Sequence, residues 1–435
     1  MAEPRCAAAH PPSSDLAPAK IARRILPFLF VLYVMSYLDR TNVAFARVPM
    51  NAELGFTEAT YGLGTGLFFI GYFFLGIPGA LIVERWGARR LIGFTAIAWG
   101  VATCLFASVK SPAQFYAFRL LLGLSAAPFF PGVIVYLSNW FPERDRSRAL
   151  AAFMIAAPIS LTLGGPLSAL ILGTHWVWFS GWQWIFILEG LPTICLGMVA
   201  FFVLKDSAKQ AQWLVGSERG LPRSAPITVA PPKPWWKVLC ERNVILLCGA
   251  HAFANIAGYG FIFWLPSTVK NAIGSTAGSS AAMADAITAI PFGLSVLAMW
   301  LAARSSDRRG ERKLHACLPM LCAAFLYTLT LVRGQPSALV LVWICLTGAC
   351  VFAWVPGFWA LPTTISTGPA RAASIGLINA IGNLGGFLGP AIIGQLLTRT
   401  RSGTALVILV ALSYCAAAGL TSLVRPKPRQ WLAPS

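Results

Sequence analysis

Charged residues are scarce in this sequence, and acidic ones most of all. Only 11% of the 435 residues are charged, and the 34 Lys and Arg outnumber the 15 Asp and Glu. A soluble globular domain has about 25% charged residues. A chain that is 57% hydrophobic and carries 16 Trp has too few polar side chains to cover a core of that size. The composition excludes a soluble fold and indicates an integral membrane protein.

The sequence also lacks the motifs of catalysis and of metal binding. It has no H-E-x-x-H, no G-x-S-x-G, no G-x-x-x-x-G-K-[ST] and no cluster of His with carboxylates. Its ten Cys show no C-x-x-C or Cys/His ligand spacing, and most lie in apolar segments, which favours a packing role. We therefore expect no enzyme activity, no metal and no cofactor, with a proton as the only coupling ion.

What the sequence has instead is a series of long apolar stretches. Twelve of them can span a hydrocarbon layer about 30 Å thick. An even number of spans predicts both termini on one side of the membrane. Lys and Arg concentrate in the two tails and in alternate loops, which predicts that these segments are cytoplasmic. The net charge of +19 thus reflects topology, and we expect no nucleic-acid partner. The spans begin near Ile25, Tyr61, Leu91, Ala113, Ala149, Gln183, Val244, Met283, His315, Ser337, Ala373 and Gly403.

One loop occurs twice in the chain. Residues 84–90 follow the second span in the order acid-Arg-x-Gly-x-basic-basic, and residues 307–313 repeat that order after the eighth span. Equivalent loops in two halves predict duplicated six-span bundles, with the two loops acting as cytoplasmic latches that break as that side opens. The alternative is that both loops are only cationic anchors at the membrane surface. The predicted gating residues are Glu84, Arg85, Gly87, Arg89, Asp307, Arg308, Gly310 and Arg312.

The predicted fold is therefore an all-α membrane protein with twelve transmembrane helices in two six-helix bundles. Its parts are a cytoplasmic tail over residues 1–24, an N-terminal bundle over 25–204, a cytoplasmic linker over 205–242, a C-terminal bundle over 243–424 and a cytoplasmic tail over 425–435.

Two arginines are predicted to lie inside the spans. Arg40 is about 22 Å along the first span, and Arg119 in the fourth span reaches about the same depth. A charge near the middle of a membrane helix costs about 3 kcal/mol, so such residues usually face a water-filled path. Two guanidinium groups at one depth predict a carboxylate site, because each offers two parallel donors. The alternatives are that Asp39 and Arg40 reach the outer interface, and that Arg119 does so or pairs with Asp39.

Several stretches carry a resemblance to a known family. They are YLDRTNVAFA (37–46), RLLLG and FFPG (119–123 and 129–132), GWQWIFILEGLP (181–192), GYGFIFWLP (258–266), SDRRGERKLH (306–315) and NAIGNLGGFLGPAIIG (379–394). With the paired loops, they resemble the anion:cation symporter family of the major facilitator superfamily, which carries tartrate, phthalate and sugar acids.

The resemblance implies a secondary active transporter in the lipid bilayer of the cell (inner) membrane. It would import a small organic anion by alternating access, with Arg40 and Arg119 binding the carboxylate. We expect a multi-pass protein that acts as a monomer.

Proton coupling depends on few residues. The resemblance implies a protonatable carboxylate at Asp39; its protonation would raise the local charge from +1 to +2 and favour a bound anion. In the family that the sequence resembles, the position of Ala126 is a Glu, so an uncoupled facilitator is the alternative.

His251 is a candidate substitute for this Glu because His changes charge near neutral pH, although a hydrogen-bonded core residue is the alternative. Glu189 is expected to pair within the bundle, and Asp285 to lie at the membrane interface.

The C-terminal half has no cations at the positions equivalent to the two arginines. We expect Asn379 to donate hydrogen bonds to the substrate and Trp359 to present an aromatic surface, with helix packing as the alternative for both. Tyr37 and Tyr72 complete a site with mainly apolar walls. An aromatic acid or a small dicarboxylate is therefore favoured over a sugar acid.

Overall fold

The fold is described by a computed structural model that covers residues 16–141, 149–150, 152–173, 178–206, 211, 241–273, 281–365 and 369–425. Helices are the only regular secondary structure in these residues, so the prediction of an all-α protein is confirmed. Both tails beyond these ranges and most of the predicted linker lie outside them. The helices are α1 (Leu16–Leu54), α2 (Glu58–Trp86), α3 (Ala88–Phe106), α4 (Pro112–Ala126), α5 (Phe129–Trp140), α7 (Ala156–Leu172), α8 (Gly181–Val203), α10 (Arg242–Ile273), α11 (Ala281–Ile287), α12 (Ala289–Arg309), α13 (Lys313–Leu329), α14 (Ser337–Ala353), α15 (Val355–Ile365), α16 (Pro369–Thr400) and α17 (Gly403–Ser422).

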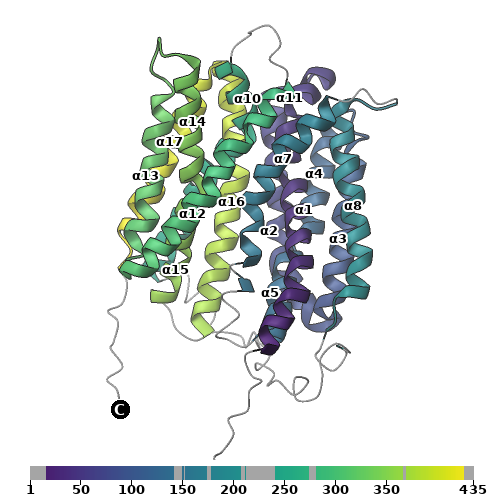
Figure 1. Cartoon of the computed structure of the whole chain (residues 1–435). Helices are drawn as coiled ribbons and strands as arrows, with labels where there is room; N and C mark the ends of the chain where they lie inside the picture. Colours follow the sequence, from purple (N-terminus) through teal and green to yellow (C-terminus); the bar gives the residue numbers. More distant parts are fainter. Residues whose placement is uncertain are drawn as a thin grey trace, which may run out of the picture.

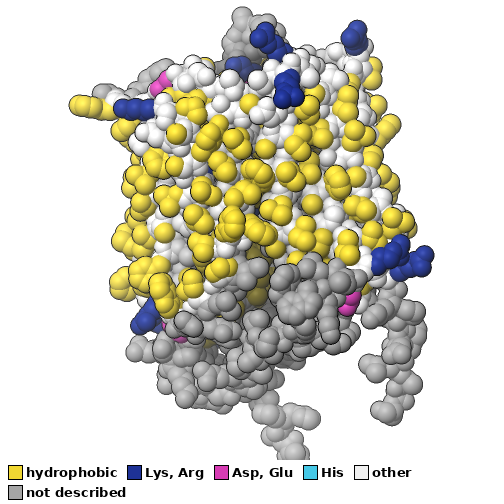
Figure 2. All heavy atoms as spheres, turned by 180° about the vertical axis from the view of Figure 1, so that it is seen from behind, with side chains coloured by type: hydrophobic (Ala, Val, Ile, Leu, Met, Phe, Trp, Pro, Cys, Tyr) yellow, Lys and Arg dark blue, Asp and Glu magenta, His cyan; other side chains and the backbone are white. Residues whose placement is uncertain are grey.

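Most of these helices are suited to cross a membrane. Ten helical stretches in the described part of the chain are long and apolar enough to span one, and α2 and α13 bring the number of rods to twelve. Three of the rods join two consecutive helices: α4 with α5, α11 with α12, and α14 with α15. Hydrophobic side chains cover the middle of the surface in Figure 2, and Lys and Arg lie toward its two ends. Phe202 and Leu170 are 78% and 71% exposed, which is favourable only where hydrocarbon covers them.

The rods form two groups that stand side by side. Figure 1 shows helices α1 to α8 in purple to teal on one side and α10 to α17 in green to yellow on the other. The groups touch where α2 packs along α16, where α7 packs on α11 and α12, and where α1 meets α10. We call these groups the N-terminal half and the C-terminal half.

The two ends of the molecule differ in what they contain. We call the end at which α1 begins the lower end, and the end at which α1 stops and α2 begins the upper end, as drawn in Figure 1. Asn243 at the start of α10 donates a hydrogen bond to the carbonyl of Arg425, which follows α17, so α17 ends beside the start of α10. Which end faces the cytoplasm stays a prediction from the distribution of Lys and Arg.

Glycines allow the closest helix contacts. A Cβ on Gly62 would lie 2.2 Å from the carbonyl oxygen of Pro390, across the contact between α2 and α16. A Cβ on Gly123 would lie 2.0 Å from the carbonyl oxygen of Phe68, where α4 crosses α2. Small residues at such crossings let the two backbones approach, which is a common way for membrane helices to associate. The contact of Gly123 with Phe68 therefore holds α4 close to α2, the helix that carries the Phe68 ring.

We expect Gly123→Ala to destabilise the N-terminal half. The added methyl group has no space against a main-chain oxygen, and forcing extra atoms into a packed contact costs about 1–3 kcal/mol. The measurement is the melting temperature of the purified protein in detergent. Gly419→Ala in α17 is the matched control, because a Cβ there would meet nothing within 4 Å. A melting temperature for Gly123→Ala equal to that of the control would contradict the tight crossing.

Candidate functional site

Arg40 lies in a cage of aromatic rings in the membrane-spanning part of α1. It is only 8% exposed, and its Cζ lies 4.8 Å from the ring centroid of Tyr37 and 5.1 Å from those of Phe68 and Tyr72. Its Nη1 donates a hydrogen bond of 3.3 Å to the hydroxyl oxygen of Tyr259, which comes from the C-terminal half. The faces of aromatic rings attract a cation by about 0.5–2 kcal/mol each, but they leave its charge in place.

Arg119 approaches the same ring from α4. It is 0% exposed, and its Cζ lies 5.3 Å from the ring centroid of Phe68. Its Nη2 donates long hydrogen bonds of 3.4 Å to the carbonyl oxygens of Arg40 and Thr65. The two guanidinium groups therefore lie on one aromatic ring, as the predicted depth of the two residues had indicated.

Neither of these cations has a carboxylate partner among the described residues. Three of their N–H groups also have no acceptor there: Nε of Arg40, and Nε and Nη1 of Arg119. A buried charge without a partner costs several kcal/mol, and each unpaired donor adds to that cost. A carboxylate bound between the two side chains would supply both the missing charge and the missing acceptors. The ion pairs of the described part of the chain lie elsewhere, at Arg47 with Glu58, Arg89 with Asp206, Arg312 with Asp307 and His315 with Glu311.

Asp39 faces the opposite side of α1. It is 1% exposed, and its Oδ2 accepts hydrogen bonds from Nε1 of Trp99 (3.0 Å) in α3 and from Oγ1 of Thr193 (3.1 Å) in α8. Adjacent residues of a helix point about 100° apart, which separates Asp39 from Arg40. The hydrogen bonds of Arg119 go to carbonyl oxygens, so the alternative of a pair between Arg119 and Asp39 is not what the structure shows.

Two other acidic residues are buried. Neither carboxyl oxygen of Glu189 accepts a hydrogen bond of good geometry in the described residues, but the Asn42 amide of α1 stabilises its charge, so the expected pairing within the bundle stays a prediction. Asp285 in α11, expected at the interface, is buried as well. The end of a span is not exposed to water when another helix covers it, and here α7 packs on α11.

His251 is hydrogen-bonded on both ring nitrogens. Its Nδ1 lies 3.0 Å from the carbonyl oxygen of Ile378, which can only accept, and its Nε2 lies 3.3 Å from Nδ2 of Asn255. The same Asn255 amide donates to the carbonyl oxygen of Gly382 at 2.8 Å, which fixes its orientation. These contacts suit a neutral imidazole that links α10 to α16, the arrangement of a packed core residue. A coupling role for His251 stays a prediction.

The other predicted residues of the C-terminal half lie near this histidine. The ring centroid of Trp359 is 5.1 Å from that of His251. Asn379 in α16 follows the residue whose carbonyl contacts His251 and is partly buried. No contact within the described residues joins Trp359 or Asn379 to the two arginines, so their role in binding stays a prediction.

Tyr259 is the residue that the sequence interpretation missed. It lies in the GYGFIFWLP stretch, so its position in a motif was visible. Its place opposite Arg40 depends on how the two halves dock, which the sequence does not show. Its ring also packs on Phe69 of α2 at 4.4 Å between centroids, so it lies at the junction of the halves.

The first of the two predicted gating loops is bonded within its own half. The backbone N–H of Arg89 donates to Oδ1 of Asp206 at 3.0 Å, and Nε of Arg89 lies 3.6 Å from Oδ2 of the same carboxylate. Gly87 has φ +81°, a conformation that side chains rarely adopt, which explains a glycine in this turn. The side chains of Glu84 and Arg85 lie outside the described residues.

The second loop is also closed within its half. Arg312 pairs with Asp307 at 2.5 Å, Gly310 takes a left-handed conformation with φ +66°, and Arg308 is exposed. Burial raises the pKa of Glu311, but hydrogen bonds from the backbone N–H of Leu314 and from the His315 ring outweigh burial and hold that pKa below its ordinary value. The described part of this loop thus shows no contact with the N-terminal half, and its action as a latch stays a prediction.

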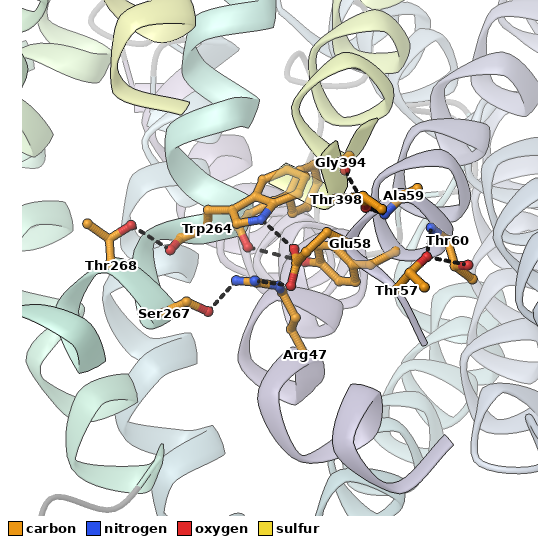
Figure 3. A network of polar contacts seen from close by, with 12 residues as sticks. Arg47, Thr57, Glu58, Ala59, Thr60, Trp264, Ser267, Thr268, Gly394 and Thr398 are labelled. Atoms are coloured by element: carbon orange, nitrogen blue, oxygen red, sulfur yellow. Dashed lines mark hydrogen bonds and ion pairs between the residues drawn. The ribbon is translucent and has the colours of Figure 1, made fainter. Parts of the chain in front are cut away.

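Besides the hydrogen bond from Arg40 to Tyr259, the polar contacts that join the halves in the described residues lie at the upper end. Figure 3 shows Arg47 of α1 and Glu58 of α2 facing Trp264 and Ser267 of α10. Nη2 of Arg47 pairs with Oε1 of Glu58 at 2.6 Å, and Nη1 of Arg47 donates to the Ser267 hydroxyl oxygen. Nε1 of Trp264 donates to Oε2 of Glu58 at 2.9 Å. An ion pair of the N-terminal half is thus held on both sides by the C-terminal half.

Two more contacts extend this upper network. The backbone N–H of Ala59 donates to Oγ1 of Thr398 in α16 at 2.9 Å (Figure 3). The hydroxyl of Tyr61 donates to the carbonyl oxygen of Phe263 at 3.2 Å. Arg47 also lies 5.3 Å from the ring centroid of Tyr61. We call the set of Arg47, Glu58, Ala59, Tyr61, Phe263, Trp264, Ser267 and Thr398 the upper network.

Comparisons with known proteins agree with this architecture. The sequence model of the Major Facilitator Superfamily matches residues 29–390. A protein of Agrobacterium vitis named as a tartrate transporter is 39% identical over 390 residues, which cover 88% of each chain. The inner membrane transport protein RhmT of Escherichia coli is 36% identical over 84% of this chain and 85% of its own. The inward-open structure of the xylose transporter XylE from E. coli superposes with a TM-score of 0.74 and 15% identity, over 94% of this chain and 98% of that one.

The match to the family model covers more than half of the chain, the two sequence relatives align over most of their length, and the structural likeness shows the same fold. The chain therefore belongs to the Major Facilitator Superfamily of membrane transporters, and it is a multi-pass protein of the cell membrane.

Proposed function

We propose that this protein is a secondary active transporter that imports an organic carboxylate by proton-coupled alternating access. The observation that carries the proposal is the pair of Arg40 and Arg119, two buried cations on the Phe68 ring with no carboxylate partner in the described residues. A pocket with two such charges favours an anion and disfavours a neutral or cationic compound.

The surroundings of the arginines point to a class of substrate. Tyr37, Phe68 and Tyr72 present ring faces beside Arg40, and the hydroxyl of Tyr259 accepts a hydrogen bond from it. Such walls suit an aromatic acid or a small dicarboxylate and offer few partners to the hydroxyl groups of a sugar acid. The relative named as a tartrate transporter supports the dicarboxylate class.

Asp39 is the proposed proton acceptor in the N-terminal half. It precedes Arg40 in the chain, so a proton on its carboxylate removes a negative charge next to the anion site. The net charge of Asp39, Arg40 and Arg119 then rises from +1 to +2, and anion binding becomes more favourable. Ala126 supports the second candidate function, an uncoupled facilitator for the same anions, because the acidic position of helix 4 is missing.

The upper network supports alternating access. It joins the two halves at one end, so a site between them opens to that side only when its contacts break. The charge distribution predicts that the upper end faces outward, which makes the upper network the proposed outer gate.

Loss of either arginine is expected to abolish most transport. Breaking a buried, hydrogen-bonded charge contact costs about 2–5 kcal/mol, so Arg40→Gln and Arg119→Gln should each lower uptake by about 30-fold or more. Initial uptake of labelled tartrate and phthalate by proteoliposomes measures the effect. Arg333→Gln, which removes an exposed arginine, is the control and should transport normally. Normal uptake of all tested organic acids by either site variant would refute the proposed function.

The mode of coupling is tested by comparing two assays on the same proteoliposomes. A proton symporter should accumulate labelled substrate above its external concentration when the outside is acidified. A facilitator should exchange labelled for unlabelled substrate equally well and never exceed the external concentration. Counterflow without accumulation would assign the facilitator and remove proton coupling from the proposal.

Covalent closure of the upper end is expected to stop turnover. In a cysteine-free background, Ala59→Cys with Thr398→Cys places two thiols at positions that touch in this structure. Oxidation should block uptake because the upper end cannot open, and reduction should restore it. Each single cysteine variant under the same oxidation is the control. Full turnover by protein shown to be crosslinked would contradict the gate.

A further inference from the structure

The anion site leaves a second buried group of polar side chains unexplained. Behind α1, on the side away from the two arginines, Asp39 and Glu189 are 1% and 4% exposed. Glu189 lies in α8, which packs on α1, α3 and α7. The carboxyls of Asp39 and Glu189 interact electrostatically, and the second side chain that acts on Glu189 is the Asn42 amide, which is 1% exposed and lies within hydrogen-bond reach.

No cation of the described residues reaches these acids. Arg40 and Arg119 point to Phe68, and α7 contributes no titratable side chain between Ala156 and Leu172. From α3 the remaining titratable neighbour is the thiol of Cys104, which senses the Asp39 charge; on α8 itself Cys195 is exposed. The two carboxyl groups therefore face each other's charge with no compensating cation.

Asp39 and Glu189 differ in how many of their carboxyl oxygens accept hydrogen bonds. Oδ1 of Asp39 and both oxygens of Glu189 accept no hydrogen bond of good geometry in the described residues, although the Asn42 amide lies close enough to stabilise the Glu189 charge. Oδ2 of Asp39 accepts hydrogen bonds from Trp99 and Thr193. Three carboxyl oxygens of two buried acids therefore lack a good donor, which favours a proton on one of the acids.

Thr193 links the Asp39 carboxyl to the backbone of Glu189. Its hydroxyl lies 3.1 Å from Oδ2 of Asp39 and 2.9 Å from the carbonyl oxygen of Glu189, one turn earlier in α8. A hydroxyl has one proton, so it donates to one of these oxygens at a time. When Asp39 is ionised, Thr193 can donate to it; when Asp39 carries a proton, Asp39 can donate to Thr193, which then donates to the Glu189 carbonyl.

We propose that Asp39 and Glu189 together form the binding site for the transported proton, with Glu189 replacing the acid that helix 4 lacks at Ala126. Two buried carboxylates close to each other cannot both ionise without a large cost, so the pair holds at least one proton. Uptake of a further proton forms one O–H bond and brings the pair from a charge of −1 to 0. The two arginines across α1 are then unopposed, and an anion binds more tightly.

This inference rests on the proposed function, because it explains how that anion transport is driven. The test uses the full-length protein in proteoliposomes, with labelled tartrate as the probe and the membrane potential clamped at zero. Each coupled proton supports about tenfold accumulation per pH unit of gradient. Glu189→Gln is expected to lose this accumulation, down to a ratio of about one, and to keep counterflow. Glu189→Asp, which keeps a carboxyl group, should restore part of it.

Matched variants separate a proton site from general damage. Glu53→Gln removes a carboxylate of the same half that bonds to Trp182 of α8, and it should accumulate substrate normally. Asp39→Asn should resemble Glu189→Gln, and the double variant should be no worse than either, because the pair acts as a unit. A pH-sensitive dye inside the vesicles should show proton entry with tartrate in the parental protein and none in Glu189→Gln.

Three results would overturn the proton site. Glu189→Gln that accumulates tartrate as the parental protein does excludes Glu189. Accumulation that follows a sodium gradient in place of a pH gradient assigns a metal cation to the same oxygens. If Glu189→Gln does not fold, absence of proton entry during tartrate uptake by the parental protein still refutes the idea. Failure of the proposed function looks different, since the parental protein would then show no counterflow of any organic acid.

Discussion

The burial of two arginines without a carboxylate partner is the constraint on which the site depends. Aromatic rings and carbonyl oxygens reduce the free-energy cost of burying these charges. Phe68 lies against both guanidinium groups, and main-chain oxygens accept hydrogen bonds from Arg119. Neither kind of contact cancels a positive charge. In the proposed function, a bound anion compensates these charges, and their attraction selects the substrate.

Helix geometry explains why the site does not neutralise itself. Asp39 and Arg40 are neighbours in the chain, yet the turn of α1 sends the carboxylate to Trp99 and Thr193 and the guanidinium to the opposite side. An ion pair between them would have left little attraction for a substrate. With one helix between them, they still influence each other electrostatically, because screening by water is weak in the interior. In the proposed function, this arrangement lets a proton on Asp39 change anion binding on the other side of α1.

The sequence alone predicted the helical fold and the meeting of Arg40 with Arg119, because apolar length, charge asymmetry and depth along a helix are local properties. It did not predict Tyr259 beside Arg40, because that contact depends on how two halves dock. It also did not predict Asn42 as the neighbour of Glu189, because a partner in a bundle depends on the rotation of each helix about its own axis. Sequence periodicity constrains that rotation poorly in α8, where apolar residues lie all round the helix.

In the proposed transport cycle, the contacts between the halves make opening the upper end more costly in free energy than opening the lower end. At the upper end, Arg47 and Glu58 share their ion pair with Ser267 and Trp264. At the lower end, Arg89 and Arg312 pair with acids of their own half. In the proposed cycle, opening the upper end separates the Arg47–Glu58 pair from Ser267 and Trp264, whereas the lower pairs do not cross from one half to the other. Water entering the opened end must replace these contacts, and an anion that attracts both arginines can offset part of that cost by drawing the halves together around it.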